Sequence, residues 1–142
     1  MNTAVAITVS LAFVALALWH FRMALSPSQG MSGAVPSESG KPLFVPSVRA
    51  TLAVGLVLLV FACLVAATAG FVEVGLPVRL LTWSCYALSL GLFARAVGEF
   101  KYVGFFKRVR GSKFARLDTL LYSPLCLLLA AGVAFVAGQH GV

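Results

Sequence analysis

The residues of this sequence with types and spacing suited to chemistry are Arg95, Glu99, Asp118, Tyr122 and His20. Arg95 and Glu99 are one helical turn apart, and so are Asp118 and Tyr122, and each pair adjoins a long apolar run. A guanidinium binds a carboxylate through two parallel hydrogen bonds, and ionisable groups at membrane depth are often functional. We therefore expect Arg95 to pair with Glu99 or Asp118.

A helical projection at 100° per residue places Arg95 on a face that is small in its middle and polar at one end. Small residues favour close helix packing, so this face predicts that Arg95 points into a bundle rather than into lipid. The face contains Ser84, Leu88, Gly91, Arg95, Glu99 and Tyr102. The candidate binding cluster at this level is His20, Arg95, Glu99, Tyr102, Asp118 and Tyr122.

Three interpretations of the cluster stay open. It is a structural ion-pair network that joins two helices, a ligand-binding or catalytic pocket, or, less favoured, part of a channel or transporter. Glu73 is the only acid near the opposite side of the membrane, and the middle of the predicted spans offers only Ser, Thr and Cys, so no polar path crosses the membrane. No catalytic motif is recognisable, and whether the protein is an enzyme stays open.

The composition is that of an integral membrane protein. Of the 142 residues 61% are hydrophobic and only 11% are charged, and the mean hydropathy is +1.00. A soluble domain carries about 25% charged residues, so these side chains are too few for a water-facing surface. This composition favours a membrane protein, with its helices packed together inside a bilayer.

Four apolar runs are long enough to cross a membrane, which takes about 20 helical residues. We expect a single all-α domain over 1–142, a bundle of four transmembrane helices. The predicted helices are residues 2–22, 47–71, 77–100 and 118–138. Proline and glycine predict a loop over 23–46, and Pro124 predicts a kink in the last helix or a start at Ser123.

The segment 101–117, KYVGFFKRVRGSKFARL, alternates aromatic residues with cations. It is too polar to span a membrane, and this pattern is typical of a segment in the plane of the interface. We expect its cations to face anionic lipid. They are Lys101, Lys107, Arg108, Arg110, Lys113 and Arg116.

The distribution of cations predicts the orientation. If the loop 23–46 and the segment 101–117 are cytoplasmic, only Arg79 among the 11 basic residues lies outside. The others are Arg22, Lys41, Arg49, Arg95, Lys101, Lys107, Arg108, Arg110, Lys113 and Arg116. We expect a multi-pass protein of the bacterial plasma (inner) membrane with the N-terminus and the C-terminus outside.

Neither a metal nor a cofactor is expected. The three cysteines, Cys63, Cys85 and Cys126, lie singly inside apolar runs, where they are typical small buried residues. The net charge of +7 comes from cations beside membrane spans, and no nucleic-acid motif accompanies it. The partners that this pattern indicates are membrane lipids, most of all anionic ones, and a second copy or another membrane subunit.

Several stretches resemble one family of small bacterial membrane proteins, catalogued as a domain of unknown function, DUF3995. They are RAVGEFKYVGFFK (95–107), FARLDT (114–119), YSPLC (122–126), HF (20–21), AVP (34–36) and GKPLF (40–44). The resemblance covers nearly the whole chain and implies four membrane helices. It implies no activity, but His20, Arg95, Glu99 and Asp118 match its motifs.

One stretch departs from that family. The family usually has an aromatic pair and a Trp-Ala-x-Gly-Gly-like run after the histidine, where this chain has FRMALS over 21–26. A pocket shaped by that run would differ here. The leading functional hypothesis is a non-enzymatic module that binds lipid or a partner subunit through its cytoplasmic rim. The alternative is an enzyme or binder with a pocket in the cytoplasmic leaflet for an amphipathic ligand with an anionic head.

Overall fold

Four long helices make up most of the computed structural model, which describes residues 2–26 and 31–140. The elements in chain order are α1 (Asn2–Leu25), α2 (Met31–Ala34), β1 (Ser37–Glu38), β2 (Lys41–Pro42), α3 (Val48–Thr68), α4 (Val78–Val97), α5 (Lys113–Leu117), a π-helical turn η2 (Asp118–Tyr122) and α6 (Ser123–His140). The last three form one helix of 28 residues. This helix, α1, α3 and α4 are each long and apolar enough to cross a membrane.

Large apolar side chains are exposed along all four long helices. Leu11 on α1, Val60 on α3, Leu90 on α4 and Leu128 on α6 are each more than 60% exposed. A water-soluble protein rarely exposes so much apolar surface, whereas a bilayer covers it. The chain is therefore an all-α, multi-pass membrane protein, as the composition predicts.

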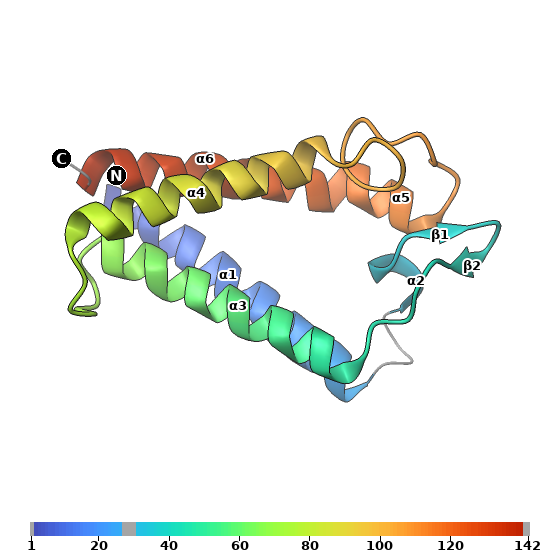
Figure 1. The fold of residues 1–142 in the computed structure, drawn as a ribbon, viewed down its shortest axis with the longest axis horizontal. Helices are drawn as coiled ribbons and strands as arrows, with labels where there is room; N and C mark the ends of the chain where they lie inside the picture. Colours follow the sequence, from blue (N-terminus) through green and yellow to red (C-terminus); the bar gives the residue numbers. More distant parts are fainter. Residues whose placement is uncertain (1, 27–30, 141–142) are drawn as a thin grey trace.

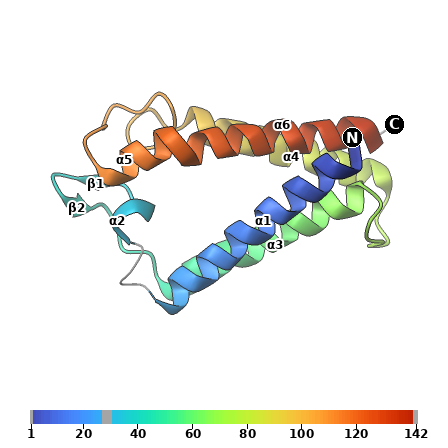
Figure 2. The same ribbon diagram turned by 180° about the vertical axis from the view of Figure 1, so that it is seen from behind.

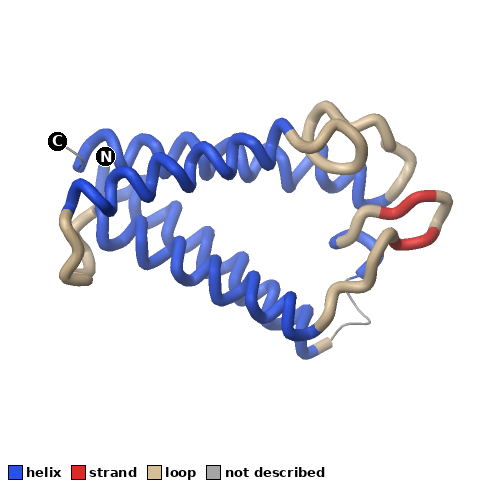
Figure 3. The backbone as a smooth tube through the Cα atoms, in the orientation of Figure 1, coloured by secondary structure: helices blue, strands red, loops and turns tan. Residues whose placement is uncertain are grey.

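The four helices form two pairs arranged as a V (Figures 1 and 2). Helix α1 packs along α3, and α4 packs along α6. The pairs meet at the end that carries both termini, here called the terminal end, where Asn2 Nδ2 donates to Gln139 Oε1 over 3.1 Å. They diverge toward the other end, here called the basic end, where α2 and the β1–β2 hairpin lie across the opening (Figure 3).

The short turn between α3 and α4 predicts antiparallel neighbours, and the two helices are antiparallel and lie closest together near that turn. The hydroxyl of Thr68 and the thiol of Cys85 lie 3.2 Å apart there, and the helices then separate into different arms of the V. Close packing occurs elsewhere. A methyl group added at Gly55 would lie 2.4 Å from the Phe21 ring on α1, and one at Gly132 would lie 2.6 Å from Val9.

Helix α4 ends earlier than the sequence predicts, at Val97 instead of residue 100. Gly98 follows in a left-handed conformation with φ of 88°, which ends the helix because only glycine adopts it without strain. Glu99 and Tyr102 therefore leave the helix, and the projected face that grouped them with Arg95 does not exist beyond Val97. Smaller differences are that α1 extends to Leu25 and that α3 covers 48–68 instead of 47–71.

The last helix begins at Lys113 instead of 118, because the Ser112 hydroxyl caps it by accepting from the Ala115 amide over 3.0 Å. It is continuous from Lys113 to His140 and includes Pro124, although regular α-helical geometry resumes at Ser123 after a π-helical turn. The π-helical turn lies directly before the proline, and such a wider turn gives the pyrrolidine ring room inside a helix.

The predicted loop over 23–46 contains short regular structure in its described part. Residues 31–34 form one helical turn, and Ser37–Glu38 pairs antiparallel with Lys41–Pro42. Residues 27–30 of that predicted loop lie outside the described residues. The segment 98–112 is an irregular loop, here called the basic loop, and the rest of the expected interfacial segment, Lys113–Leu117, is helix α5.

Candidate functional site: a buried carboxylate beside an intramembrane cavity

The carboxylate of Asp118 is the centre of the polar network. It is fully buried. Its Oδ1 accepts from Arg95 Nη2 over 2.8 Å, and its Oδ2 accepts from Lys107 Nζ over 3.0 Å and from the Gly104 amide over 2.7 Å. Two cations and one amide thus surround one carboxylate, which joins α4 and the basic loop to the last helix. The predicted pair of Arg95 with Asp118 is present.

Lys107 corrects one prediction, because it does not face lipid. Its side chain is only 2% exposed. Besides Asp118, its ammonium donates to the Gly104 carbonyl over 2.9 Å and to the Thr119 hydroxyl over 2.5 Å. These three acceptors satisfy the three N–H donors of a lysine. Of the six cations expected at the lipid surface, the other five are exposed: Lys101, Arg108, Arg110, Lys113 and Arg116.

The basic loop places Lys107 inside because its backbone folds back onto α4. The Phe105 amide donates to the Ala96 carbonyl over 2.9 Å. At the crossing point, a Cβ on Gly98 would lie 1.8 Å from the Val103 oxygen, and one on Gly104 would lie 2.3 Å from the Val97 oxygen. No side chain fits at either position, so the two glycines allow this crossing. The sequence alone did not predict this role for either glycine.

Glu99 and Tyr102 do not join the buried network. The exposed Glu99 carboxylate accepts from the Tyr102 amide over 2.6 Å, within the basic loop. The Tyr102 hydroxyl donates to Glu38 Oε2 over 2.9 Å, which ties this loop to the β1–β2 hairpin. Glu99 is therefore not the partner of Arg95. The physical reason is the end of α4 at Val97, which directs the chain away from Arg95 before Glu99 is reached.

A cavity of about 280 Å³ lies between the two helix pairs, next to the network. All four long helices contribute apolar side chains to its wall, among them Phe13, Leu58, Leu92 and Leu129. Three members of the predicted cluster, His20, Arg95 and Tyr122, line it as well. Trp19, Phe114 and Cys126 also line it, and the sequence reading gave them no such role.

The polar groups of the cavity wall are positioned by separate contacts. The His20 Nδ1 lies 2.7 Å from the Leu16 carbonyl, and because a carbonyl only accepts, Nδ1 is the donor in this hydrogen bond. The Tyr122 hydroxyl donates to the Gly33 carbonyl over 2.9 Å, which holds α2 against the last helix. Among the described residues, Arg95 Nη1 is shielded from solvent and has no hydrogen-bond partner.

This arrangement is suited to holding an anion. Arg95 is permanently protonated and Lys107 is buried beside it, while Asp118 is the only carboxylate that contacts either of them within residues 2–26 and 31–140. A guanidinium N–H without a partner in a low-dielectric site is a strong donor to an incoming oxyanion. In the described part of the chain, no three His, Cys, Asp or Glu side chains come together to hold a metal ion.

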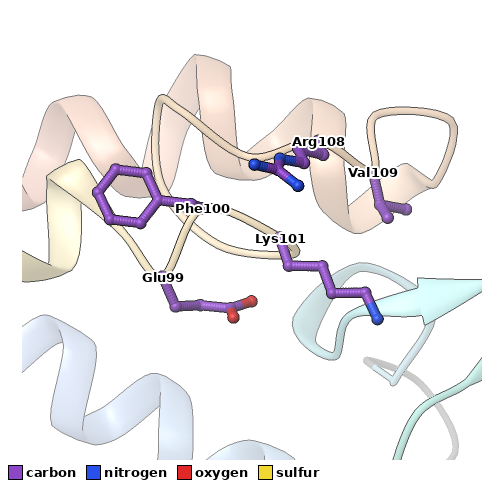
Figure 4. Close-up of a pocket in the computed structure, with 5 residues that line it drawn as sticks. All are labelled: Glu99, Phe100, Lys101, Arg108 and Val109. Carbon is purple, nitrogen blue, oxygen red and sulfur yellow. The ribbon is translucent and has the colours of Figure 1, made fainter.

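A second hollow, of about 320 Å³, lies on the basic loop (Figure 4). Glu99, Phe100, Lys101, Arg108 and Val109 line it. In the close-up, the Lys101 and Arg108 side chains extend from different parts of the same loop, and the Phe100 ring and the Arg108 guanidinium extend to the side opposite to the Lys101 ammonium. This hollow shares no lining residue with the cavity between the helix pairs.

Comparison with known proteins gives one match. A family model described as a protein of unknown function (DUF3995) matches residues 13–133, which include α1 from Phe13 onward, the basic loop and most of α6. No curated protein and no solved structure matches the chain. Because the match covers most of the chain, including Asp118 and its partners, the protein belongs to the DUF3995 family.

Proposed function

We propose that this protein binds an amphipathic molecule with an anionic head in the cavity between its two helix pairs. The observation that carries the proposal is the Arg95 guanidinium, which lines this cavity and whose buried Nη1 has no hydrogen-bond partner among the described residues. A buried donor left without a partner destabilises a protein by about 1–3 kcal/mol. A ligand oxyanion at this position would remove that penalty.

The wall of the cavity supports a ligand with a single apolar chain. Its volume of about 280 Å³ is near the lower end of the roughly 300–1,000 Å³ typical of small-molecule sites. Apart from His20, Arg95 and Tyr122, the wall is made almost entirely of apolar side chains. A chain of methylene groups fits such a wall, while the anionic head meets the Arg95 guanidinium.

The proposed setting is the bacterial inner membrane, with the basic end in the cytoplasm. The exposed cations of the basic loop and of the hairpin support this orientation, since cytoplasmic loops carry an excess of Lys and Arg. The cavity would then open within the cytoplasmic leaflet. Ligand binding alone accounts for the geometry, and no reaction step is part of this proposal.

The test uses a single-chain fatty acid that bears a diazirine, with the alcohol of the same chain length for comparison. The protein is held in nanodiscs of zwitterionic lipid, and mass spectrometry measures the cross-link yield. We expect the acid to cross-link more than the alcohol, and Cys126→Phe, which fills the cavity, to abolish the difference. Leu127→Phe is the matched control, because Leu127 is 42% exposed on the outer face of the same helix.

A second variant separates head recognition from cavity shape. Arg95→Lys keeps a cation next to Asp118 but removes the second guanidinium nitrogen. We expect acid binding to weaken at least about tenfold, since a hydrogen bond to a charged group contributes roughly 1.5–3 kcal/mol, with little change in thermal stability. Equal labelling by acid and alcohol, or an equal loss in both phenylalanine variants, would rule the proposal out.

A second candidate function, binding of lipid through the basic end, rests on the exposed cations of the basic loop. A different set of residues carries it, and it is developed below.

A further inference from the structure

The hollow on the basic loop combines two exposed cations with an exposed aromatic ring. Lys101 and Arg108 lie on its wall, with Phe100 beside them and Val109 at its edge (Figure 4). Glu99 is the one acid of the wall, and its carboxylate already accepts from the Tyr102 amide. The cations are therefore in excess over the acid around this hollow, which favours an anionic group.

Two exposed phenylalanines indicate which kind of anionic molecule fits this surface. The side chains of Phe100 and Phe106 are 56% and 62% exposed, and their ring centroids are 6.5 Å apart. Phe100 has a φ of 68°, a left-handed conformation that is a genuine outlier for a bulky residue. Such strain persists only where the surroundings impose it, and here it holds an apolar ring on the outside. A soluble anion gains nothing from exposed rings, whereas a lipid acyl region covers them.

The loop is preformed rather than shaped by its ligand. The Lys101 carbonyl accepts from the Arg108 amide over 3.1 Å and from the Val109 amide over 2.9 Å, so the backbones of the two cations are joined. The same loop is anchored by the Gly104 amide and the Lys107 ammonium on buried Asp118. Little conformational entropy is then lost on binding, which strengthens a contact made by a few side chains.

The Lys101 side chain keeps its positive charge. Its ammonium lies 4.8 Å from the centroid of the Tyr102 ring. A hydrogen bond with the Tyr102 hydroxyl raises the pKa of Lys101 above its ordinary value. A lysine with a raised pKa stays protonated throughout the physiological range, so the cation is present whenever lipid is.

We propose that the basic loop is a docking surface for an anionic phospholipid, with the lipid phosphate in the hollow between Lys101 and Arg108 and with Phe100 and Phe106 inserted at the acyl boundary. This site is separate from the central cavity and does not depend on the function proposed there. The ligand class is a membrane phospholipid with net negative charge, such as phosphatidylglycerol.

The experiment measures lipids retained by the purified full-length protein. Native mass spectrometry follows the protein after exchange from equimolar phosphatidylglycerol and phosphatidylcholine at low salt. We expect the wild type to retain the anionic lipid preferentially. Lys101→Gln combined with Arg108→Gln should reduce that preference, by roughly thirtyfold at most for two cations next to an anionic surface. Arg79→Gln, an exposed cation at the terminal end, is the matched control.

Phe100→Gly tests the ring without loss of the fold. Glycine adopts a φ of 68° without strain, so this variant should unfold at the same temperature as the wild type or at a higher one. We expect it to retain less anionic lipid, while Arg79→Gln retains the wild-type amount. Equal retention of both lipids by the wild type would overturn the proposal. The proposal would also be overturned if Arg79→Gln reduced the retention of anionic lipid as much as the loop variants do. In that case the total charge of the protein, and not the hollow, would determine lipid retention.

Discussion

At the residue scale, the structure depends on one buried acid with two cationic partners. Asp118 holds Arg95 from α4 and Lys107 from the basic loop, and all three are within the residues that match the family. Breaking a buried ion pair by removing one partner is more damaging than removing both, because the remaining charge stays buried without compensation. This asymmetry gives a signed prediction.

We predict that Asp118→Asn lowers the free energy of unfolding by about 3–5 kcal/mol, because it leaves two cations without their acid. Adding Lys107→Met to Asp118→Asn should recover part of that loss, so the double-mutant cycle should be non-additive. Unfolding in detergent, followed by circular dichroism, measures each variant. Glu99→Gln is the control with little effect, since Glu99 accepts only the Tyr102 amide at an exposed position. Strict additivity would count against the network.

The sequence predicted the Arg95–Asp118 pair for a reason that is only partly right. Gly91 was expected to allow a close helix contact beside Arg95, but it is exposed and has no neighbouring atom near where its Cβ would be. The side chain turns inward because its acid is buried there. The burial of Lys107 depends on the path of the whole basic loop, and a cation in an aromatic-rich segment carries no local sign of that path.

At the element scale, the four spans were predictable because each is a nearly unbroken apolar run of about the length that a bilayer requires. The ends of the helices were less predictable. Gly98 stops α4 three residues early and Ser112 starts the last helix five residues early, and each end depends on a local conformation that hydropathy does not report.

The crossing of the basic loop over α4 predicts a sharp difference between glycines. Gly98→Ala and Gly104→Ala each place a Cβ against backbone oxygen at a positive φ, so each should destabilise the protein by roughly 3 kcal/mol or more. Gly111→Ala, in the same loop, has open space around its Cβ and should change stability by less than about 0.5 kcal/mol. Thermal unfolding of the three variants under the same conditions tests this prediction. Equal unfolding midpoints for all three would contradict the crossing of the basic loop over α4.

At the scale of the whole molecule, the orientation proposed for the basic end can be measured directly. In a background with Cys63→Ser, Cys85→Ser and Cys126→Ser, a cysteine is introduced by Gly111→Cys or by Gln139→Cys. Both positions are exposed, one in the basic loop and one at the terminal end. We expect an impermeant maleimide to label intact cells that carry Gln139→Cys, and to label Gly111→Cys only after the cells are permeabilised. The opposite pattern would invert the topology.

The divergence of the two helix pairs gives the molecule unequal cross-sections in the two halves of a bilayer. The arms meet at the terminal end and spread at the basic end, where the hairpin and the basic loop widen the molecule further (Figure 1). A wedge of this form displaces more lipid from one leaflet than from the other and matches a membrane that bends toward its narrow side. We therefore expect the protein to be enriched in highly curved bilayers, with its basic end in the convex leaflet. Narrow membrane tubes are pulled from giant vesicles, and the fluorescence of labelled protein is compared between the tube and the nearly flat vesicle membrane. An equal density of protein in the tube and in the vesicle would show that the flanking lipids compensate for the shape.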